Sequence, residues 1–483
     1  MNDPEEILWH YHQPSRLGNI PDSPYRGQAG GAACGDLVVV RLQVEGDRVT
    51  DGGFDAQGCG AVSAAASAAL EEIVGGSVLQ AALLSAQDVS GLLGGLSAGK
   101  FHAADLVADA VAQALGRAVY AQGRSPIFKN RMMVAMSGGV DSSAVAQIMR
   151  DQGYDLSAVT VELWRDPENN AESSCCSLSA VRRARMQAHR LGIPHFTLPL
   201  HDQFRSGVVQ PYVHGHGEGV TLNPCVSCNG EVRIDAMMDL AERVGASGLA
   251  TGHYARLVRD SEGVLVAQAA DLPKDQSYML AGVKPEILER LHLPLGERTK
   301  HQVREFADQN SLLAAKTPDS QDLCFLAGTT RVRFLEKHGG LKARPGDIVD
   351  LQGNILGQHQ GAHLYTVGQR KGLGVGGGKT LYVLRIDSKN NQVVVGSRED
   401  LSQSQVHVSG VKLWRDGARV NKVKLRSKMR PLGCNLEEPM SSGKHRRAVL
   451  RLLDPAEGGV APGQSAVLMD GDQVVGVATI RPS

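Results

Sequence analysis

The sequence predicts a multidomain α/β protein with an N-terminal α+β domain, a doubly wound parallel-sheet domain and two small β-barrel domains. Three observations predict it. The length of 483 residues exceeds the usual size of a domain with a single hydrophobic core. Strand-like and helix-like segments alternate in the middle of the chain, which is typical of parallel sheets. Short strands separated by turn signals follow from about residue 340. We expect the domains at residues 1–122, 129–335, 336–404 and 405–483.

The first domain carries one strand pattern and two helix patterns before a linker. Residues 37–44 alternate apolar and polar side chains, residues 60–74 are rich in alanine, and residues 105–115 place apolar residues at helical spacing. The small, polar stretch 121–126, which ends in Pro126, indicates a linker.

Strand and helix patterns alternate through the second domain, and strands dominate the last two. In the second domain, strands are expected at 131–136, 156–161, 195–200 and 248–251, and helices at 144–150, 179–191 and 235–244. Later strands are expected at 347–350, 381–386, 393–395, 448–453 and 465–469.

Composition and charge narrow the class of protein. No run of about 18 apolar residues is present, and the start of the chain lacks a signal-peptide pattern, so we expect a cytoplasmic protein without a membrane partner. Eight cysteines are too few for a disulfide scaffold and favour ligands or catalysts. Residues 1–122 hold 14 acidic and 6 basic residues, so the balancing positive charge lies in the remainder. A nucleic-acid partner should meet that remainder, unless the split has no consequence.

The segment Ser137–Ser143, SGGVDSS, lies between a predicted strand and a predicted helix. Glycines let the backbone approach a polyphosphate, and serines and helix N-terminal amides supply donors. No Gly-Lys-Ser/Thr follows, so the segment is not a Walker A loop. The alternative is a plain strand-to-helix turn. The segment resembles the PP-loop of ATP pyrophosphatases, which implies cleavage of ATP between the α and β phosphates. That superfamily includes amide-forming synthetases as well as tRNA-thiolating enzymes.

Three cysteines help to distinguish an amide-forming synthetase from a tRNA-thiolating enzyme. Cys225 and Cys228 form a C-x-x-C among Pro, Asn and Gly residues, which favours a loop, and Cys324 stands alone. A small buried apolar side chain is the alternative for each of them. Two chemistries suit the trio: one thiolate carries a persulfide while another attacks or resolves it, or three thiolates hold an iron–sulfur cluster with one open iron.

These segments together resemble the tRNA-uridine 2-sulfurtransferases, or 2-thiouridylases, from about residue 129 to the C-terminus. The matching motifs are TVELW (160–164), NPCVSCN (223–229), ATGHYAR (250–256), KDQSY (274–278), KTPDSQDLCF (316–325), YTVGQR (365–370) and APGQ (461–464).

The resemblance implies a role for each matching residue. Cys228 is the nucleophile and Cys324 the persulfide carrier. The ATP phosphates, with Mg²⁺, are held by Ala135, Met136, Ser137, Gly138, Gly139, Val140, Asp141 and Ser142, and the nucleotide pocket is lined by Leu163 and Gly252. The tRNA is contacted by Asn223, Pro224 and Cys225 at the target base, and by His253, Lys274, Asp275, Gln276, Arg426 and Ser427 elsewhere.

One departure from the family concerns the cofactor. Many family members have Asp where Cys225 stands, and a third thiolate beside Cys228 and Cys324 favours a [4Fe-4S] cluster. The pair Cys175-Cys176 recurs in part of the family and is interpreted as pocket lining near the substrate.

Residues 4 to 120 resemble the NifU/IscU-type iron–sulfur scaffold. Cys34, Asp36, Cys59 and His102 match its ligands, whereas Ala103 replaces its third cysteine. From spacing alone, two buried cysteines and a surface histidine are an equal alternative. The resemblance implies that the module supplies sulfur or a cluster to the neighbouring site, and the loss of one thiolate favours zinc or transient cluster binding over complete cluster assembly.

The combined expectation is ATP-dependent 2-thiolation of a wobble uridine in tRNA, with a cysteine desulfurase or another sulfur donor as partner. Adenylation makes the C2 oxygen a leaving group, and sulfur replaces it. One alternative is an amide-forming PP-loop ligase, which has no use for Cys228 or Cys324. The other is a non-enzymatic iron–sulfur carrier gated by nucleotide, which needs no tRNA.

Overall fold

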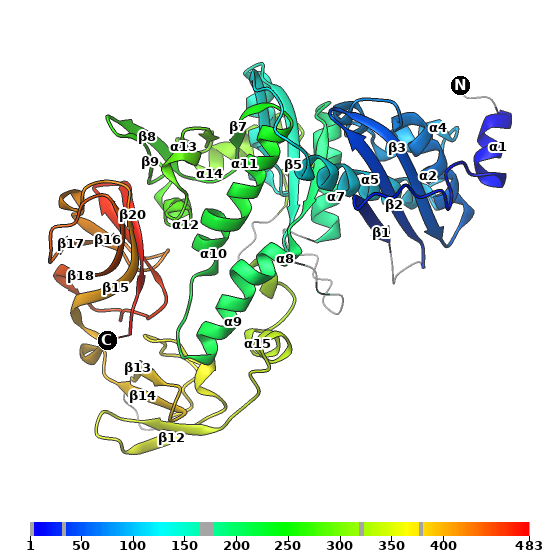
Figure 1. Ribbon diagram of the computed structural model, residues 1–483. Helices are drawn as coiled ribbons and strands as arrows, with labels where there is room; N and C mark the ends of the chain where they lie inside the picture. The colour runs from blue at the N-terminus through cyan, green and yellow to red at the C-terminus, as the bar shows by residue number, and fades with distance from the viewer. Residues whose placement is uncertain are drawn as a thin grey trace.

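The computed structural model describes residues 4–30, 35–164, 166, 177–317, 323–375 and 380–482. Figure 1 shows the N-terminal module at one end, the parallel sheet in the middle and the two β domains at the other end. Cys34 and the pair Cys175-Cys176 lie outside the described residues. In the part of the chain that is described, no helix is long and apolar enough to cross a membrane.

The N-terminal module is an antiparallel sheet covered by helices, which confirms the predicted α+β class. Its strands β1 (Arg26–Gly30), β2 (Leu37–Glu45) and β3 (Arg48–Gln57) pair in that order. Alternate residues of β2 are buried, as its sequence pattern requires. The helices are α1 (Pro4–His12), α2 (Gly60–Ile73), α3 (Val78–Ala81), α4 (Ala86–Leu92) and α5 (Phe101–Ala121).

The second domain is a parallel sheet, as predicted. It has five strands in the order β10-β7-β4-β5-β6, and the short edge strand β10 was not among the predicted ones. The strands are β4 (Phe128–Ala135), β5 (Asp155–Glu162), β6 (His195–Pro199), β7 (Ala246–Ala250) and β10 (Leu291–His292). Helices α6 (Val140–Asp151), α7 (Leu178–Arg190), α11 (Ile234–Arg243) and α14 (Lys300–Gln309) accompany them. Because the strands are parallel, their carboxyl ends meet at one edge, where α/β proteins bind ligands.

Two continuous helices stand at that edge, and each contains a π-helical segment. The first runs through α8 (His201–Phe204), η1 (Arg205–Val209) and α9 (Gln210–Gly217), and the second through α10 (Pro224–Ser227), η2 (Cys228–Arg233) and α11. The predicted loop around Cys225 and Cys228 was therefore wrong. Pro224 occupies the first turn, where a missing N–H costs nothing, and Asn223 caps it, so the same residues begin a helix.

The last two domains are β domains whose strands pair antiparallel, except for the parallel pair β11 and β14 in the central one. The central one orders its strands β12-β11-β14-β13, namely β11 (Gly346–Val349), β12 (Ile355–His359), β13 (Tyr382–Asp387) and β14 (Gln392–Gly396). The C-terminal one comprises β15 (Gln403–Leu413), β16 (Lys422–Lys424), β17 (Leu432–Leu436), β18 (Gly443–Ala456), β19 (Ser465–Asp470) and β20 (Gln473–Ile480). Pairing of β15 with both β18 and β20 closes this sheet into a six-stranded barrel.

The N-terminal module is packed into the second domain. Helix α5 lies along the edge strand β6, and a Cβ on Gly116 would collide with the carbonyl of Thr197. The Arg185 side chain on α7 is 2% exposed and pairs with Asp109 and Asp105 of α5. The predicted linker is pinned too, since the Ser125 hydroxyl donates to the Arg243 carbonyl over 2.6 Å. The module is therefore held fixed against the parallel-sheet domain.

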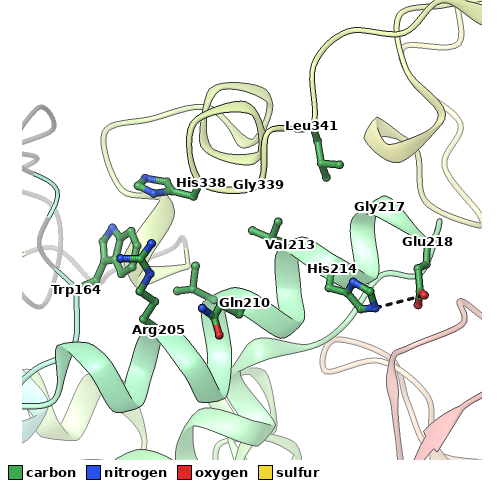
Figure 2. Close-up of a pocket in the computed structure, with 11 residues that line it drawn as sticks. Trp164, Arg205, Gln210, Val213, His214, Gly217, Glu218, His338, Gly339 and Leu341 are labelled. Atoms are coloured by element: carbon green, nitrogen blue, oxygen red, sulfur yellow. Dashed lines mark ion pairs between the residues drawn. The ribbon is translucent and has the colours of Figure 1, made fainter.

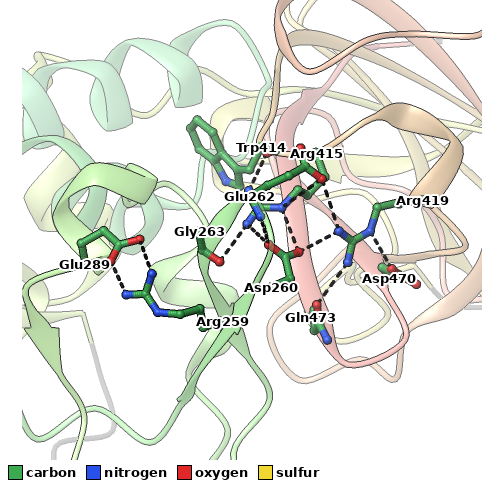
Figure 3. A network of polar contacts seen from close by, with 10 residues as sticks. All are labelled: Arg259, Asp260, Glu262, Gly263, Glu289, Trp414, Arg415, Arg419, Asp470 and Gln473. Atoms are coloured by element: carbon green, nitrogen blue, oxygen red, sulfur yellow. Dashed lines mark hydrogen bonds and ion pairs between the residues drawn. The ribbon is translucent and has the colours of Figure 1, made fainter.

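A polar network attaches the C-terminal barrel to a hairpin of the second domain, β8 (Arg256–Asp260) and β9 (Gly263–Ala267) (Figure 3). The Asp260 carboxylate accepts from Arg415 at 2.8 and 3.0 Å and from Arg419 at 2.8 Å. These hydrogen bonds hold the pKa of Asp260 well below its usual range.

Asp109→Ala should destabilise the protein by about 3 kcal/mol, because it removes a partner from the buried Arg185 guanidinium. Urea unfolding measures the change. Asp51→Ala, which breaks the more exposed Arg16–Asp51 pair, should cost at most about 1 kcal/mol. Equal effects of the two substitutions would contradict the docking role.

Acid should weaken the barrel attachment. Asp260 has a lowered folded pKa, so its stabilisation is complete above its ordinary pKa of about 3.9 and is lost as the pH falls through the lower folded value. Asp260→Asn should lower the urea midpoint at pH 7 and shrink the further fall between pH 5 and pH 3. Asp22→Asn, at an exposed site, should leave both unchanged.

Candidate functional site

The glycine-rich turn lies between the end of β4 and the start of α6, at the carboxyl edge of the sheet. Gly138 has a φ of +71°, and a Cβ there would collide with the Ala180 carbonyl at the start of α7, so this position requires glycine. The Ser142 hydroxyl accepts from the Ser137 amide over 3.1 Å and donates to the Gly139 carbonyl over 3.2 Å. No side chain caps the α6 N-terminus within the described residues, so its amides and dipole are available to an anion.

Asp141, in the first turn of α6, is held by two residues that the sequence analysis did not assign. The Lys300 ammonium lies 2.7 Å from both carboxylate oxygens, and the Tyr254 hydroxyl donates over 2.8 Å. Tyr254 stands inside the ATGHYAR motif, which offered a signal, but nothing local marks Lys300, 159 residues away from Asp141 in the chain. These groups place a cation beside the turn, where polyphosphate charge would gather.

The other predicted nucleotide residues lie at the same edge. Gly252 packs on the turn, since a Cβ there would come within 3.1 Å of the Ser142 amide nitrogen. Leu163 follows β5 and is buried in the core cluster that also holds Ala135. Met136 and Val140 are buried in a second core cluster, and the Met136 amide donates to the Val159 carbonyl over 2.8 Å.

Cys228 is buried at the first residue of η2, and Cys225 is half-buried one turn earlier on the same helix. Residues i and i+3 share one helix face, so both thiols lie on the same side. Asn223 caps this helix, its side-chain oxygen accepting the Cys225 amide over 3.0 Å. Pro224 is buried.

Cys324 begins the short helix η4 (Cys324–Leu326) and is half-buried. Its neighbour Phe325 packs edge-to-face on Phe204 and Tyr212, with ring centroids 5.9 and 5.1 Å away. Both aromatic rings belong to the helix that runs from α8 to α9, whose η1 segment packs against η2. The Cys228 and Cys324 segments therefore lie against the same helix.

A short segment connects the glycine-rich turn to the Cys228 helix. The Gln276 side chain accepts the Tyr254 amide over 2.9 Å, and the Tyr254 hydroxyl reaches Asp141. On the other side of the segment, the Met279 carbonyl accepts from the Asn229 side chain over 3.4 Å. Tyr278, in α12 (Ser277–Leu280), is buried, which raises its pKa to about 12 although it bonds with Asn223. The segment Gln276–Leu280 thus joins the two halves of the site.

Several residues that are predicted to contact tRNA form hydrogen bonds or ion pairs with other residues of the chain. The Asp275 carboxylate is 2% exposed and lies 3.0 Å from the Lys424 ammonium, and Arg426 donates to the Val367 and Gly459 carbonyls. His253 accepts or donates a 2.8 Å bond with Thr251, and burial lowers its pKa to about 3. Lys274 and Ser427 are partly exposed. Contacts of these residues with RNA stay predictions.

The scaffold residues form a compact ligand group. The ligand atoms of Asp36, Cys59 and His102 all lie within 4.8 Å of one another. His102 Nε2 is 2.7 Å from the Asp36 carboxylate, a hydrogen bond that lowers the pKa of Asp36. A carboxylate, a thiol and an imidazole suit zinc or iron. Ala103 is fully buried beside this group.

Comparisons with known proteins agree with this architecture. Family profiles match the NifU-like N terminal domain (residues 2–123), the tRNA methyl transferase HUP domain (130–328), the tRNA methyl transferase PRC-barrel domain (332–397) and the aminomethyltransferase beta-barrel domain (405–480).

A "Bifunctional protein NifU/MnmA" of Rubrobacter xylanophilus is 40% identical and covers 97% of this chain and 96% of its own length. A "tRNA-specific 2-thiouridylase MnmA" of Acetivibrio thermocellus is 38% identical over 73% of this chain and 99% of its own. A solved U34-tRNA thiolase NcsA from Methanococcus maripaludis, with its [4Fe-4S] cluster, is 16% identical, with a TM-score of 0.27, over 46% of this chain and 67% of its own.

The nucleotide-binding sheet, the two β domains and the scaffold module together define a tRNA-modifying enzyme of the thiouridylase class with an iron–sulfur scaffold domain. The chain belongs to the NifU/MnmA family, in which a NifU-like domain precedes an MnmA-type tRNA-specific 2-thiouridylase. The Acetivibrio relative matches about three quarters of this chain and nearly all of its own length.

Gly138→Ala should disrupt the turn, because its positive φ and its contact with Ala180 both exclude a Cβ. We expect nucleotide binding at least tenfold weaker, together with a lower melting temperature. Gly139→Ala is the matched control, since its Cβ would meet only the Ser137 hydroxyl at 3.5 Å. Calorimetric titration with a non-hydrolysable ATP analogue measures both variants, and equal binding would contradict this account of the turn.

Proposed function

We propose that this protein replaces the C2 oxygen of the wobble uridine of tRNA with sulfur, using ATP. One observation carries the proposal: the segment Gln276–Leu280 contacts the partners of the glycine-rich turn on one side and the Cys228 helix on the other. One short segment thereby connects the proposed adenylation site to the helix of the buried thiol. An amide-forming ligase has no use for that arrangement.

In the first step, the glycine-rich turn binds the phosphates of Mg²⁺-ATP, and Lys300 offsets part of the charge that Asp141 and the phosphates share. The uridine C2 oxygen attacks the α phosphate and pyrophosphate leaves. Extruding the base from its stack costs on the order of a few kcal/mol.

In the second step, sulfur replaces the activated oxygen. A persulfide on Cys324 adds its outer sulfur to C2, and AMP leaves with the old oxygen. Attack by the Cys228 thiolate on the Cys324 sulfur then releases the 2-thiouridine and leaves a Cys228–Cys324 disulfide, which an external thiol reduces. In the alternative, Cys225, Cys228 and Cys324 would hold a [4Fe-4S] cluster, which would supply a site for sulfide.

The barrel offers a surface for tRNA phosphates. Lys444, Arg446 and Arg447 are exposed and line a surface hollow of about 500 Å³, and no ion-pair partner is found for them among the described residues. Lys444 pairs in register with Lys412, whose ammonium lies 2.9 Å from Glu231, three residues after Cys228. Positive charge beside the thiol helix favours an RNA backbone there.

The N-terminal module is proposed to supply sulfur or a metal cluster in cis, with a cysteine desulfurase or another donor upstream. Arg182 pairs with Asp105 and Arg185 with Asp109, so α5 and α7 run in the same direction. The first turn of α7 touches Gly138. His102, in the first turn of α5, therefore lies toward the edge of the sheet that carries the glycine-rich turn.

Purified protein, given ATP, a persulfide donor and tRNA with a wobble uridine, should form 2-thiouridine, AMP and pyrophosphate, measured by nucleoside mass spectrometry and phosphate assay. Cys228→Ser and Cys324→Ser should each reduce thiolation at least a thousandfold. Cys59→Ser should retain it when the donor is in excess. Pyrophosphate release without thiolation by the wild type would refute the proposal.

Anaerobic purification with iron and sulfide counts separates the two sulfur routes. Because the scaffold group can also bind iron, the counts are made in a Cys59→Ser background. Iron that is lost in Cys225→Ala along with thiolation supports the cluster. An iron-free protein that still thiolates tRNA supports the Cys228–Cys324 persulfide route.

A further inference from the structure

The helix that runs from α8 to α9, against which both cysteine segments lie, also lines a cavity that none of the steps above uses. Figure 2 shows this cavity, of about 490 Å³, along the outer side of η1 and α9. Trp164, Arg205 and His338 stand at one end, Gln210 lies between, and His214 with its partner Glu218 stands at the other end. The volume is within the range of small-ligand sites, roughly 300–1,000 Å³.

The Trp164 end is built from an aromatic cluster. The Trp164 ring lies edge-on to His338, with centroids 5.0 Å apart, and tilted against Phe334 at 5.7 Å. The half-buried indole therefore has a fixed position while part of it still borders the cavity. A fixed aromatic ring at the edge of an open cavity is the usual platform for an unstacked base.

The polar residues of the cavity suit one nucleotide. Arg205 is an exposed cation on η1, able to pair with a phosphate, and the Gln210 amide can donate to and accept from a base edge. The Asp166 carboxylate is already paired with the Lys337 ammonium over 2.7 Å, and Glu218, which lies 3.3 Å from His214, stands at the far end of the cavity. A phosphate entering at Arg205 therefore meets little repulsion.

The cavity is coupled to the thiol site by packing. Phe334, which supports Trp164, also packs on Phe325 with centroids 5.0 Å apart, and Phe325 directly follows Cys324. Trp164 itself directly follows Leu163 at the carboxyl end of β5. A ligand here would be a neighbour of whatever is bound at the thiols.

We propose that this cavity binds the unpaired nucleotide next to the target uridine in the anticodon loop, its base against Trp164 and its phosphate at Arg205. The inference rests on the proposed function, because it assumes that the uridine is delivered to Cys228 and Cys324. The cavity would then help to select the substrate. A tRNA whose neighbouring base can hydrogen-bond with the Gln210 side chain would be thiolated in preference to others.

The three tryptophans of the chain give a direct test. Replacing Trp9 and Trp414 by Phe leaves Trp164 as the reporter. Adding an anticodon stem-loop RNA with a wobble uridine should quench its fluorescence, and an abasic site on one side of that uridine should abolish the quenching.

Arg205→Ala and Gln210→Ala should weaken stem-loop binding about five- to 100-fold, with the KM for ATP unchanged. Gln203→Ala, exposed on the same helix but outside the cavity, should change neither value.

Quenching of Trp164 fluorescence that neither abasic site reduces, or equal affinities for Gln210→Ala and Gln203→Ala, would overturn the assignment while the wild type still thiolates tRNA. A Trp164 response to an added cysteine desulfurase, but not to RNA, would assign the cavity to a protein donor and would also overturn it. Failure of the wild type to thiolate any tRNA would instead refute the proposed function.

Discussion

The ion pair between Asp275 and Lys424 supports the arrangement of the whole site. Both side chains are almost completely buried, and the carboxylate also accepts from the Ala269 and Ser277 amides and from the Ser277 hydroxyl. A buried carboxylate with this many donors holds its segment in a single conformation, since any departure leaves buried charge unpaired. That segment continues into Gln276–Leu280, which contacts Tyr254 beside the glycine-rich turn, the thiol helix and, through Tyr278, the Ser465 carbonyl of the barrel.

The N-terminal module is attached to the parallel-sheet domain by packing of a helix on an edge strand. Strand β6 is an edge of the parallel sheet, and α5 covers it, as proteins commonly cover exposed edges. Close packing of Gly116 on Thr197 and burial of Arg185 make the contact resemble a core more than a tether. Because a six-residue connection leads from α5 into β4, α5 ends near the amino edge of the sheet, and its first turn, with His102, lies toward the carboxyl edge.

The π-helical segments lie in the two helices that carry the thiols and line the cavity. Such turns are rare and are found mostly at functional sites. Segment η2 carries Cys228, and η1 carries Arg205 of the cavity, while Gly207 of η1 leaves just enough room for Val232 of η2. The close contact between η1 and η2 therefore sets the helix that carries the thiols against the helix that lines the cavity.

The sequence by itself determined the four-part architecture, the parallel sheet and the glycine-rich turn, because periodicity, glycine conformation and motif spacing are local properties. The local sequence also gave one wrong prediction, since the Pro and Asn residues that suggested a loop at Cys225 instead start a helix. Only the tertiary structure decided the pairing of Lys300 with Asp141, the burial of Asp275, the docking of α5 and the cavity beside Trp164. Each of these depends on residues far apart in the chain, whose meeting has no local signature and is set by how the domains pack.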